Sequence, residues 1–183
     1  QLINGLILGS IYALIALGYT MVYGILGLIN FAHGEIVMIG AMITITCLNL
    51  LLGAGIEASG LLLVAASLLM AVPLSALLGF TVERVAYRPL RHAPRLAPLI
   101  TAIGVSIVLQ NLAMMIWGRQ YVAFPQVLPS VPHQFLGASI TTLQILIIVL
   151  AALIMGGLML LVNRTRLGRA MRATAQSPQV AQL

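Results

Sequence analysis

The sequence has very little charge. It contains no lysine and no aspartate, its acidic residues are three glutamates, and only 7% of its 183 residues are charged. A soluble domain is charged at about a quarter of its positions. This chain is 61% hydrophobic, so it has too little polar surface to cover itself in water. The shortage of charge excludes a soluble globular protein and predicts an integral membrane protein.

Cysteine is nearly absent as well. The single cysteine, Cys47, lies inside an apolar run, which excludes a disulfide within the chain. The sequence also lacks a P-loop, an HExxH zinc motif and paired acids within its apolar runs. We therefore expect no catalytic residue, no metal and no cofactor, and we expect ATP hydrolysis to take place on a partner.

Five apolar runs are long enough to cross a membrane, which takes roughly 20 residues of helix. They cover residues 6–29, 36–52, 61–82, 96–117 and 140–162. The joints between them hold the glycines, prolines and charged residues that end helices. We therefore predict an all-α, polytopic transmembrane helical bundle of about five spans, with a helix break near residues 30–35. Residues 1–183 are expected to form a single transmembrane domain.

Eight of the nine arginines lie in two clusters, residues 84–95 after the third run and residues 164–172 after the fifth. Two spans separate the clusters, so both lie on one side, and the positive-inside rule makes that side cytoplasmic. Short basic loops of this kind are not a nucleic-acid-binding face. Three predicted spans precede the first arginine cluster, and each crosses the membrane once. The N-terminus therefore faces outward, unless residues 30–35 form a re-entrant turn.

The motif NFAHGE, residues 30–35, interrupts the apolar pattern with Asn30, His33 and Glu35. In one interpretation Asn30 caps a hairpin and Glu35 lies in the first turn of the second helix, favoured by its dipole. In the other, the break lies inside the protein and His33 and Glu35 shape a polar pathway, because ionisable residues within membrane segments are rare and expensive.

The fourth run carries a second polar set. Ser106 and Gln110 are four residues apart and share a helix face, and Asn111 is adjacent to them. These side chains either bond neighbouring helices or line a pathway. The candidates for the pathway are therefore Asn30, His33, Glu35, Gln110 and Asn111.

The segment after the fifth run predicts a short amphipathic helix. Arginines recur at positions 166, 169 and 172, whereas Leu167 and Met171 form an apolar stripe. Ser177 and Pro178 then predict the start of another helix. So few residues follow that such a helix has no reason to form alone, and we expect the natural chain to continue. The basic residues hold the loop inside, touch anionic lipid or dock a protein.

Four stretches resemble one known family. GLILGSIYALIALGYTMVYGILGLINFAHGEIVMIGA is similar to the opening of LivH-type permeases, the membrane subunits of branched-chain amino-acid ABC importers. The likeness continues through ERVAYRPLR, LITAIGVSIVLQN and RLGRAMRATAQSPQVAQL. It covers nearly the whole chain.

The resemblance implies a multi-pass subunit of the bacterial inner membrane, surrounded by membrane lipid, with no nucleic-acid partner. Its partners would be a second, LivM-like permease subunit, two cytoplasmic ATP-binding subunits and a periplasmic substrate-binding protein. It also implies that residues 164–183 form a coupling segment that docks into the ATPase. The coupling candidates are Gly168, Arg169, Ala170, Arg172, Ala173, Ala175 and Ser177. Members of the family often carry an acidic residue where this chain has Ser177.

The function that we expect is translocation of branched-chain amino acids, or of related small amino acids and amides such as urea. The alternative is a secondary transporter or a channel for a small polar solute. That alternative needs ligands for a coupling ion within the spans, where only Glu35 is available.

Overall fold

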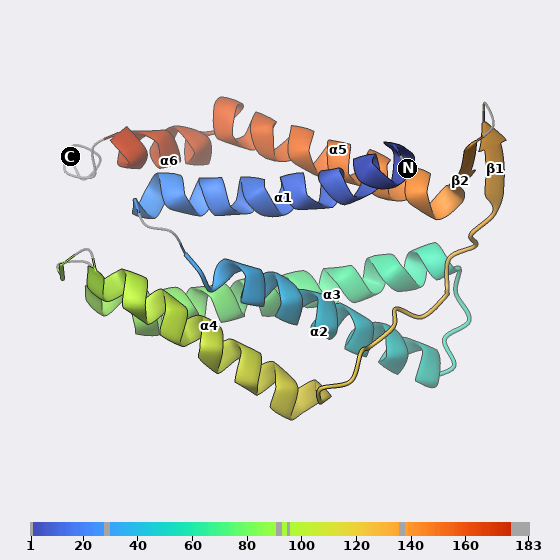
Figure 1. Cartoon of the computed structure of the whole chain (residues 1–183), viewed down its shortest axis with the longest axis horizontal. Helices are drawn as coiled ribbons and strands as arrows, with labels where there is room; N and C mark the ends of the chain where they lie inside the picture. The colour runs from blue at the N-terminus through green and yellow to red at the C-terminus, as the bar shows by residue number, and fades with distance from the viewer. Residues whose placement is uncertain (1, 28–29, 91–92, 95, 136–137, 177–183) are drawn as a thin grey trace. The chain divides into compact units, whose positions relative to one another are not determined.

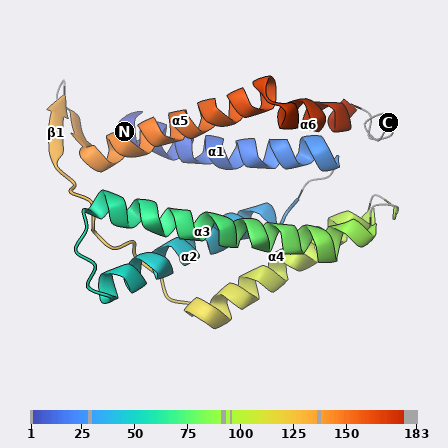
Figure 2. The same cartoon turned by 180° about the vertical axis from the view of Figure 1, so that it is seen from behind.

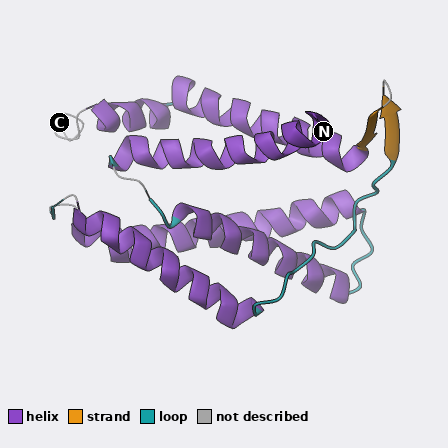
Figure 3. Cartoon of the chain, in the orientation of Figure 1, coloured by secondary structure: helices purple, strands orange, loops and turns teal. Residues whose placement is uncertain are grey.

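The computed structural model describes residues 2–27, 30–90, 93–94, 96–135 and 138–176. Helices make up most of this part of the chain (Figures 1 and 3). The chain divides into two compact units, one formed by residues 1–29 and 129–183 and the other by residues 30–128. Five helices are long and apolar enough to cross a membrane, which confirms the predicted helical bundle and its number of spans.

The unit of residues 30–128 contains three spanning helices, α2 (His33–Gly53), α3 (Gly60–Val82) and α4 (Leu96–Trp117). α3 runs antiparallel to α2, and α4 packs on α2 as well (Figures 1 and 2). A Cβ atom on Gly40 would lie 2.9 Å from the Ser75 hydroxyl, so this glycine allows α2 and α3 to approach closely. The core of the unit consists of Ala32, Ile39, Val82, Leu109 and Ala113.

The third helix is longer than the sequence predicted. We expected it to end at Val82, but it continues as a π-helical turn, Glu83–Tyr87, and a 3₁₀ turn, Arg88–Leu90. The reason is that no glycine or proline interrupts the chain before Pro89. Part of the first arginine cluster therefore lies on a helical extension and not in a loop.

The other unit contains α1 (Leu2–Leu26), a two-stranded hairpin, α5 (Thr142–Arg164) and α6 (Arg166–Gln176). α1 and α5 lie side by side and run in the same direction (Figures 1 and 2). Near their starts the Gln144 amide donates to Asn4 Oδ1 at 3.4 Å.

Several predicted boundaries are shifted, and α1 and α2 begin at Leu2 and His33, a few residues earlier than expected. α1 ends at Leu26 because Gly27 adopts a left-handed backbone, φ 65°, and its N–H donates to the Tyr23 carbonyl at 2.8 Å. α5 begins at Thr142 and not at Ile140, because the preceding residues pair in an antiparallel hairpin of β1 (Pro132–Phe135) and β2 (Ala138–Thr141). Thr141 and Gln144 then form a capping box at the start of α5.

Large apolar side chains cover much of the surface of these helices. Leu69 is 77% exposed and Met115 is 82% exposed. In water, exposed apolar surface on this scale would drive aggregation. It fits helices whose outer faces contact lipid or other transmembrane helices.

The junction of α5 and α6 depends on Gly168. α6 is the predicted amphipathic helix. Leu167, part of its apolar stripe, is 66% exposed and therefore does not hold α6 against the rest of the unit. Gly168 is buried, and a Cβ atom there would overlap the carbonyl groups of Leu161 and Val162 at the end of α5. Its N–H donates to the Thr165 hydroxyl at 3.1 Å. α6 therefore packs on α5 through backbone contact, which a side chain would prevent.

Replacement of Gly168 by alanine should detach α6 from α5. We expect a cost of ~1–3 kcal/mol, the range for overpacking a close contact, and therefore faster tryptic cleavage at the arginines of α6 in the purified full-length protein. Gly156→Ala, in open space on α5, is the matched control and should leave cleavage unchanged. Equal cleavage rates in the two variants would show that the α5–α6 contact does not hold α6.

Candidate functional site

The start of α2 is held by the side chain of Asn30. Its Oδ1 accepts a hydrogen bond from the Ala32 N–H at 3.1 Å and another from the Tyr87 hydroxyl at 2.6 Å. The His33 N–H donates to the Asn30 carbonyl at 3.1 Å. Asn30 therefore stabilises the turn and ties it to the π-helical end of α3. It does not act as the helix cap, a position that Ala32 occupies without a side-chain bond.

Glu35 lies in the first turn of α2 and is bound by two side chains of α4. The Ser106 hydroxyl donates to Glu35 Oε1 at 3.0 Å, and the Gln110 amide donates to the same oxygen at 2.7 Å. The partial positive charge of the helix N-terminus also favours a carboxylate at this position. Three polar residues from two helices thus form one cluster.

The cluster lies far from the ends of α4. Ser106 is ten residues after Leu96, where α4 begins, which corresponds to a rise of ~15 Å out of a helix length of ~33 Å. Trp117 Nε1 donates to Thr46 Oγ1 at 2.8 Å, so α2 and α4 run in the same direction in a fixed register. The first turn of α2 therefore lies beside the middle of α4.

The arrangement places a carboxylate among neutral donors. Both hydrogen bonds of Glu35 use Oε1, and within the described part of the chain no cationic side chain pairs with it. Glu35 is half-buried and Gln110 is exposed. A carboxylate that faced lipid would be strongly unfavourable. This face of the unit must therefore meet other protein or a water-filled space.

The predicted pathway residues do not all lie in this cluster. Glu35 and Gln110 meet directly, whereas Asn30 precedes α2 and bonds to Ala32 and Tyr87. His33 opens α2 and is half-buried. Asn111 is exposed, and its amide donates to the Ile107 carbonyl of its own helix at 2.8 Å, so it is not part of the Glu35 cluster.

Tyr87 is the member of this site that the sequence reading missed. It was assigned to a loop because arginines and prolines surround it. The uninterrupted stretch from Val82 to Arg88 was the signal that the helix continues. A π-helical turn inside a longer helix is frequently found at functional sites, and here it brings the Tyr87 hydroxyl to Asn30.

The coupling candidates lie on α6 on two different faces. Gly168 is buried against α5, whereas Arg172 and Ala175 face α1 and line a groove there. Apart from Gly168, the candidates within the described residues are all exposed: Arg169, Ala170, Arg172, Ala173 and Ala175. Ser177 lies outside the described residues. Among the described residues, no group of three or more histidine, cysteine or acidic side chains could hold a metal ion.

Comparison with known proteins identifies relatives along the whole chain. The family model for the permease component of branched-chain amino acid transport systems matches residues 1–183. The chain is 48% identical over 187 aligned residues to the high-affinity branched-chain amino acid transport system permease protein BraD of Pseudomonas aeruginosa. It is 46% identical to the LivH permease protein of Escherichia coli K12 and 45% identical to that of Salmonella typhimurium.

All of this chain aligns with these relatives, and it spans about three fifths of their length, 61% of BraD and 60% of each LivH protein. No solved structure matches the chain significantly. With five helices suited to span a membrane, the chain is a multi-pass protein of the inner membrane. The match over all of its residues shows that it belongs to the family of permease components of branched-chain amino acid transport systems.

Proposed function

We propose that this chain is the membrane-spanning permease subunit of an ABC importer, which moves branched-chain amino acids or related small amino acids and amides across the inner membrane. The observation that carries this proposal is the Glu35 cluster, a polar site at the broken start of α2, level with the middle of α4. The relatives are named as branched-chain amino acid transport system permease proteins, and this suggests the substrate class.

The chemistry of the cluster suits a zwitterionic amino acid. The Glu35 carboxylate has an oxygen available for a substrate ammonium group, and the Gln110 amide lies beside it. The N-terminus of α2 favours an anionic group such as the substrate carboxylate. Broken helices at mid-membrane that offer such ends are a recurrent way to build transport sites. Ser106 and Gln110 hold Glu35 in place when no substrate is bound.

The driving force must come from other subunits. We infer that two cytoplasmic ATP-binding subunits contact α6, that a second, LivM-like permease subunit completes the pathway, and that a periplasmic binding protein delivers the substrate. The exposed face of α6 that carries Arg166, Arg169 and Ala173 is the coupling surface. Arg172 is not assigned to this surface, because its guanidinium is bonded to Asn163.

Glu35→Gln should lower uptake without impairing assembly. Loss of the charge removes the ammonium ligand and weakens two charge-assisted hydrogen bonds, and we expect uptake to fall by at least about tenfold, which ~1.4 kcal/mol produces. Initial rates of leucine uptake in cells that express the full-length subunit with its partners measure the effect, normalised to the amount of assembled complex.

The matched control is Glu57→Gln, which removes the exposed carboxylate of the loop between α2 and α3. It should leave uptake unchanged. Normal uptake by Glu35→Gln would reduce Glu35 to a residue that only stabilises the start of α2, and the pathway assignment would be wrong.

Reversal of the charges of Arg166 and Arg169 to glutamate should release the ATPase. Charge pairs at the rim of an interface act partly through screened attraction, so each single variant should be affected less than the pair. Co-purification of the ATPase with the full-length double variant in detergent is the measurement. Arg119→Glu, in the loop after α4, is the control. Full recovery of the ATPase with the double variant would exclude this face of α6 as the coupling surface.

A further inference from the structure

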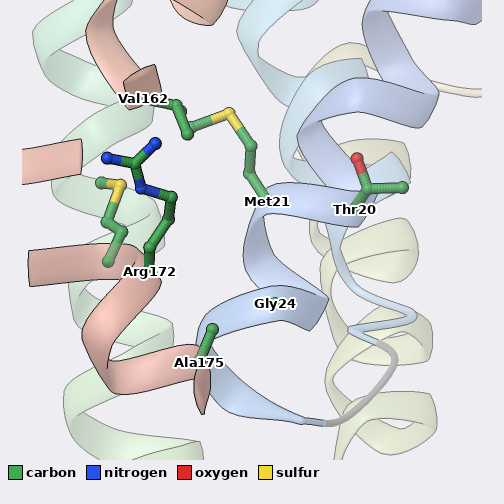
Figure 4. Close-up of a pocket in the computed structure, with 7 residues that line it drawn as sticks. Thr20, Met21, Gly24, Val162, Arg172 and Ala175 are labelled. Carbon is green, nitrogen blue, oxygen red and sulfur yellow. The ribbon is translucent and has the colours of Figure 1, made fainter. Parts of the chain in front are cut away.

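A groove lies where α6 passes the C-terminal end of α1. Its volume is about 210 Å³, and it lies between α1, the end of α5 and α6. Its lining includes three apolar side chains, those of Met21, Val162 and Met171. Thr20, Gly24 and Ala175 complete the wall. Figure 4 shows this groove with Met21 and Gly24 on α1 opposite Arg172 and Ala175 on α6.

Arg172 is the cationic residue of this groove. Its Nη1 donates to Asn163 Oδ1 at 3.2 Å and its Nη2 donates to the Asn163 carbonyl at 3.5 Å. Both acceptors are neutral, so the positive charge is positioned without being neutralised. A guanidinium carries five N–H donors, and these two bonds leave others for a ligand.

The unit that contains the groove offers no acid to balance Arg172. Residues 1–29 and 129–183 contain four arginines and neither aspartate nor glutamate, because the three glutamates of the chain are at positions 35, 57 and 83. An anionic partner for Arg172 would therefore come from outside this unit.

The place of the groove favours a lipid over a free anion. α1 and α5 both end here, and an amphipathic helix such as α6 at the end of a span lies in the interface of the bilayer. On the cytoplasmic side, where the arginine clusters place this end, anionic lipids attract basic segments. A free phosphate could use Arg172, but it would leave the methionine-lined wall of the groove without a partner.

We propose that this groove binds one anionic phospholipid, whose phosphate contacts the Arg172 guanidinium and whose acyl chain lies along Met21, Val162 and Met171. Because the lipid would contact α1, α5 and α6 together, it would hold α6 beside α1 and leave the Arg166–Arg169 face turned outward. The site is separate from the Glu35 cluster and requires no ATPase.

The test is native mass spectrometry of the purified full-length protein in micelles with equal amounts of phosphatidylglycerol and phosphatidylcholine that carry the same acyl chains. The wild-type protein should retain phosphatidylglycerol preferentially. Arg172→Gln should reduce this preference by about tenfold, the scale of a charge-assisted phosphate contact. Arg169→Gln removes the same charge from the exposed face and should leave the preference unchanged.

Asn163→Ala is a second variant that keeps every charge. It removes the side chain that positions the guanidinium, so it should lower the preference for phosphatidylglycerol by several fold. The proposal is wrong if Arg172→Gln retains the wild-type preference, which would assign Arg172 to a protein contact. It is equally wrong if Arg169→Gln lowers the preference as much as Arg172→Gln does. Binding of the lipid would then depend on the overall positive charge of α6 and not on a contact in the groove.

Discussion

The hydrogen bonds of Ser106 and Gln110 to Glu35 hold the first turn of α2 beside the middle of α4. The first turn of a helix leaves backbone N–H groups without partners inside the helix. Here the first turn lies beside the middle of α4, and the polar groups that a broken backbone exposes are satisfied by protein. Asn30 and Tyr87 serve the same purpose on the other side of the break. The position of the start of α2 beside α4 and the polar cluster therefore depend on each other.

The polar break before α2 explains the unusual composition of NFAHGE. A carboxylate within a membrane segment is retained only where protein or water surrounds it. Gly27 ends α1 with a left-handed residue, and Asn30 folds the next turn. The chain thus reaches Glu35 without a long loop. In the proposed function, the same features provide a carboxyl group on the substrate route and donors that hold it in position.

The sequence predicts the helices well because their signal is compositional. Long apolar runs separated by arginines and prolines specify the spans, and the capping and charge patterns specify α6. The pairing of Ser106 and Gln110 with Glu35 could not be read from the sequence, because it depends on the register between α2 and α4 over 71 and 75 residues. The role of Gly168 was hidden for a similar reason, since a close backbone approach has no local pattern. Tyr87 was missed because arginine was taken as a sign of a loop, although it is a good helix former.

In the proposed function, the Glu35 cluster faces an aqueous substrate route. Gln110→Cys in the full-length protein tests it most directly, since the native Cys47 is buried and gives little background. A small, charged methanethiosulfonate reagent should modify Cys at position 110, leucine should slow the reaction, and the reagent should leave Met115→Cys, on a highly exposed apolar position of the same helix, unmodified. An unreactive cysteine at position 110, or one that reacts no faster than that at 115, would contradict the account.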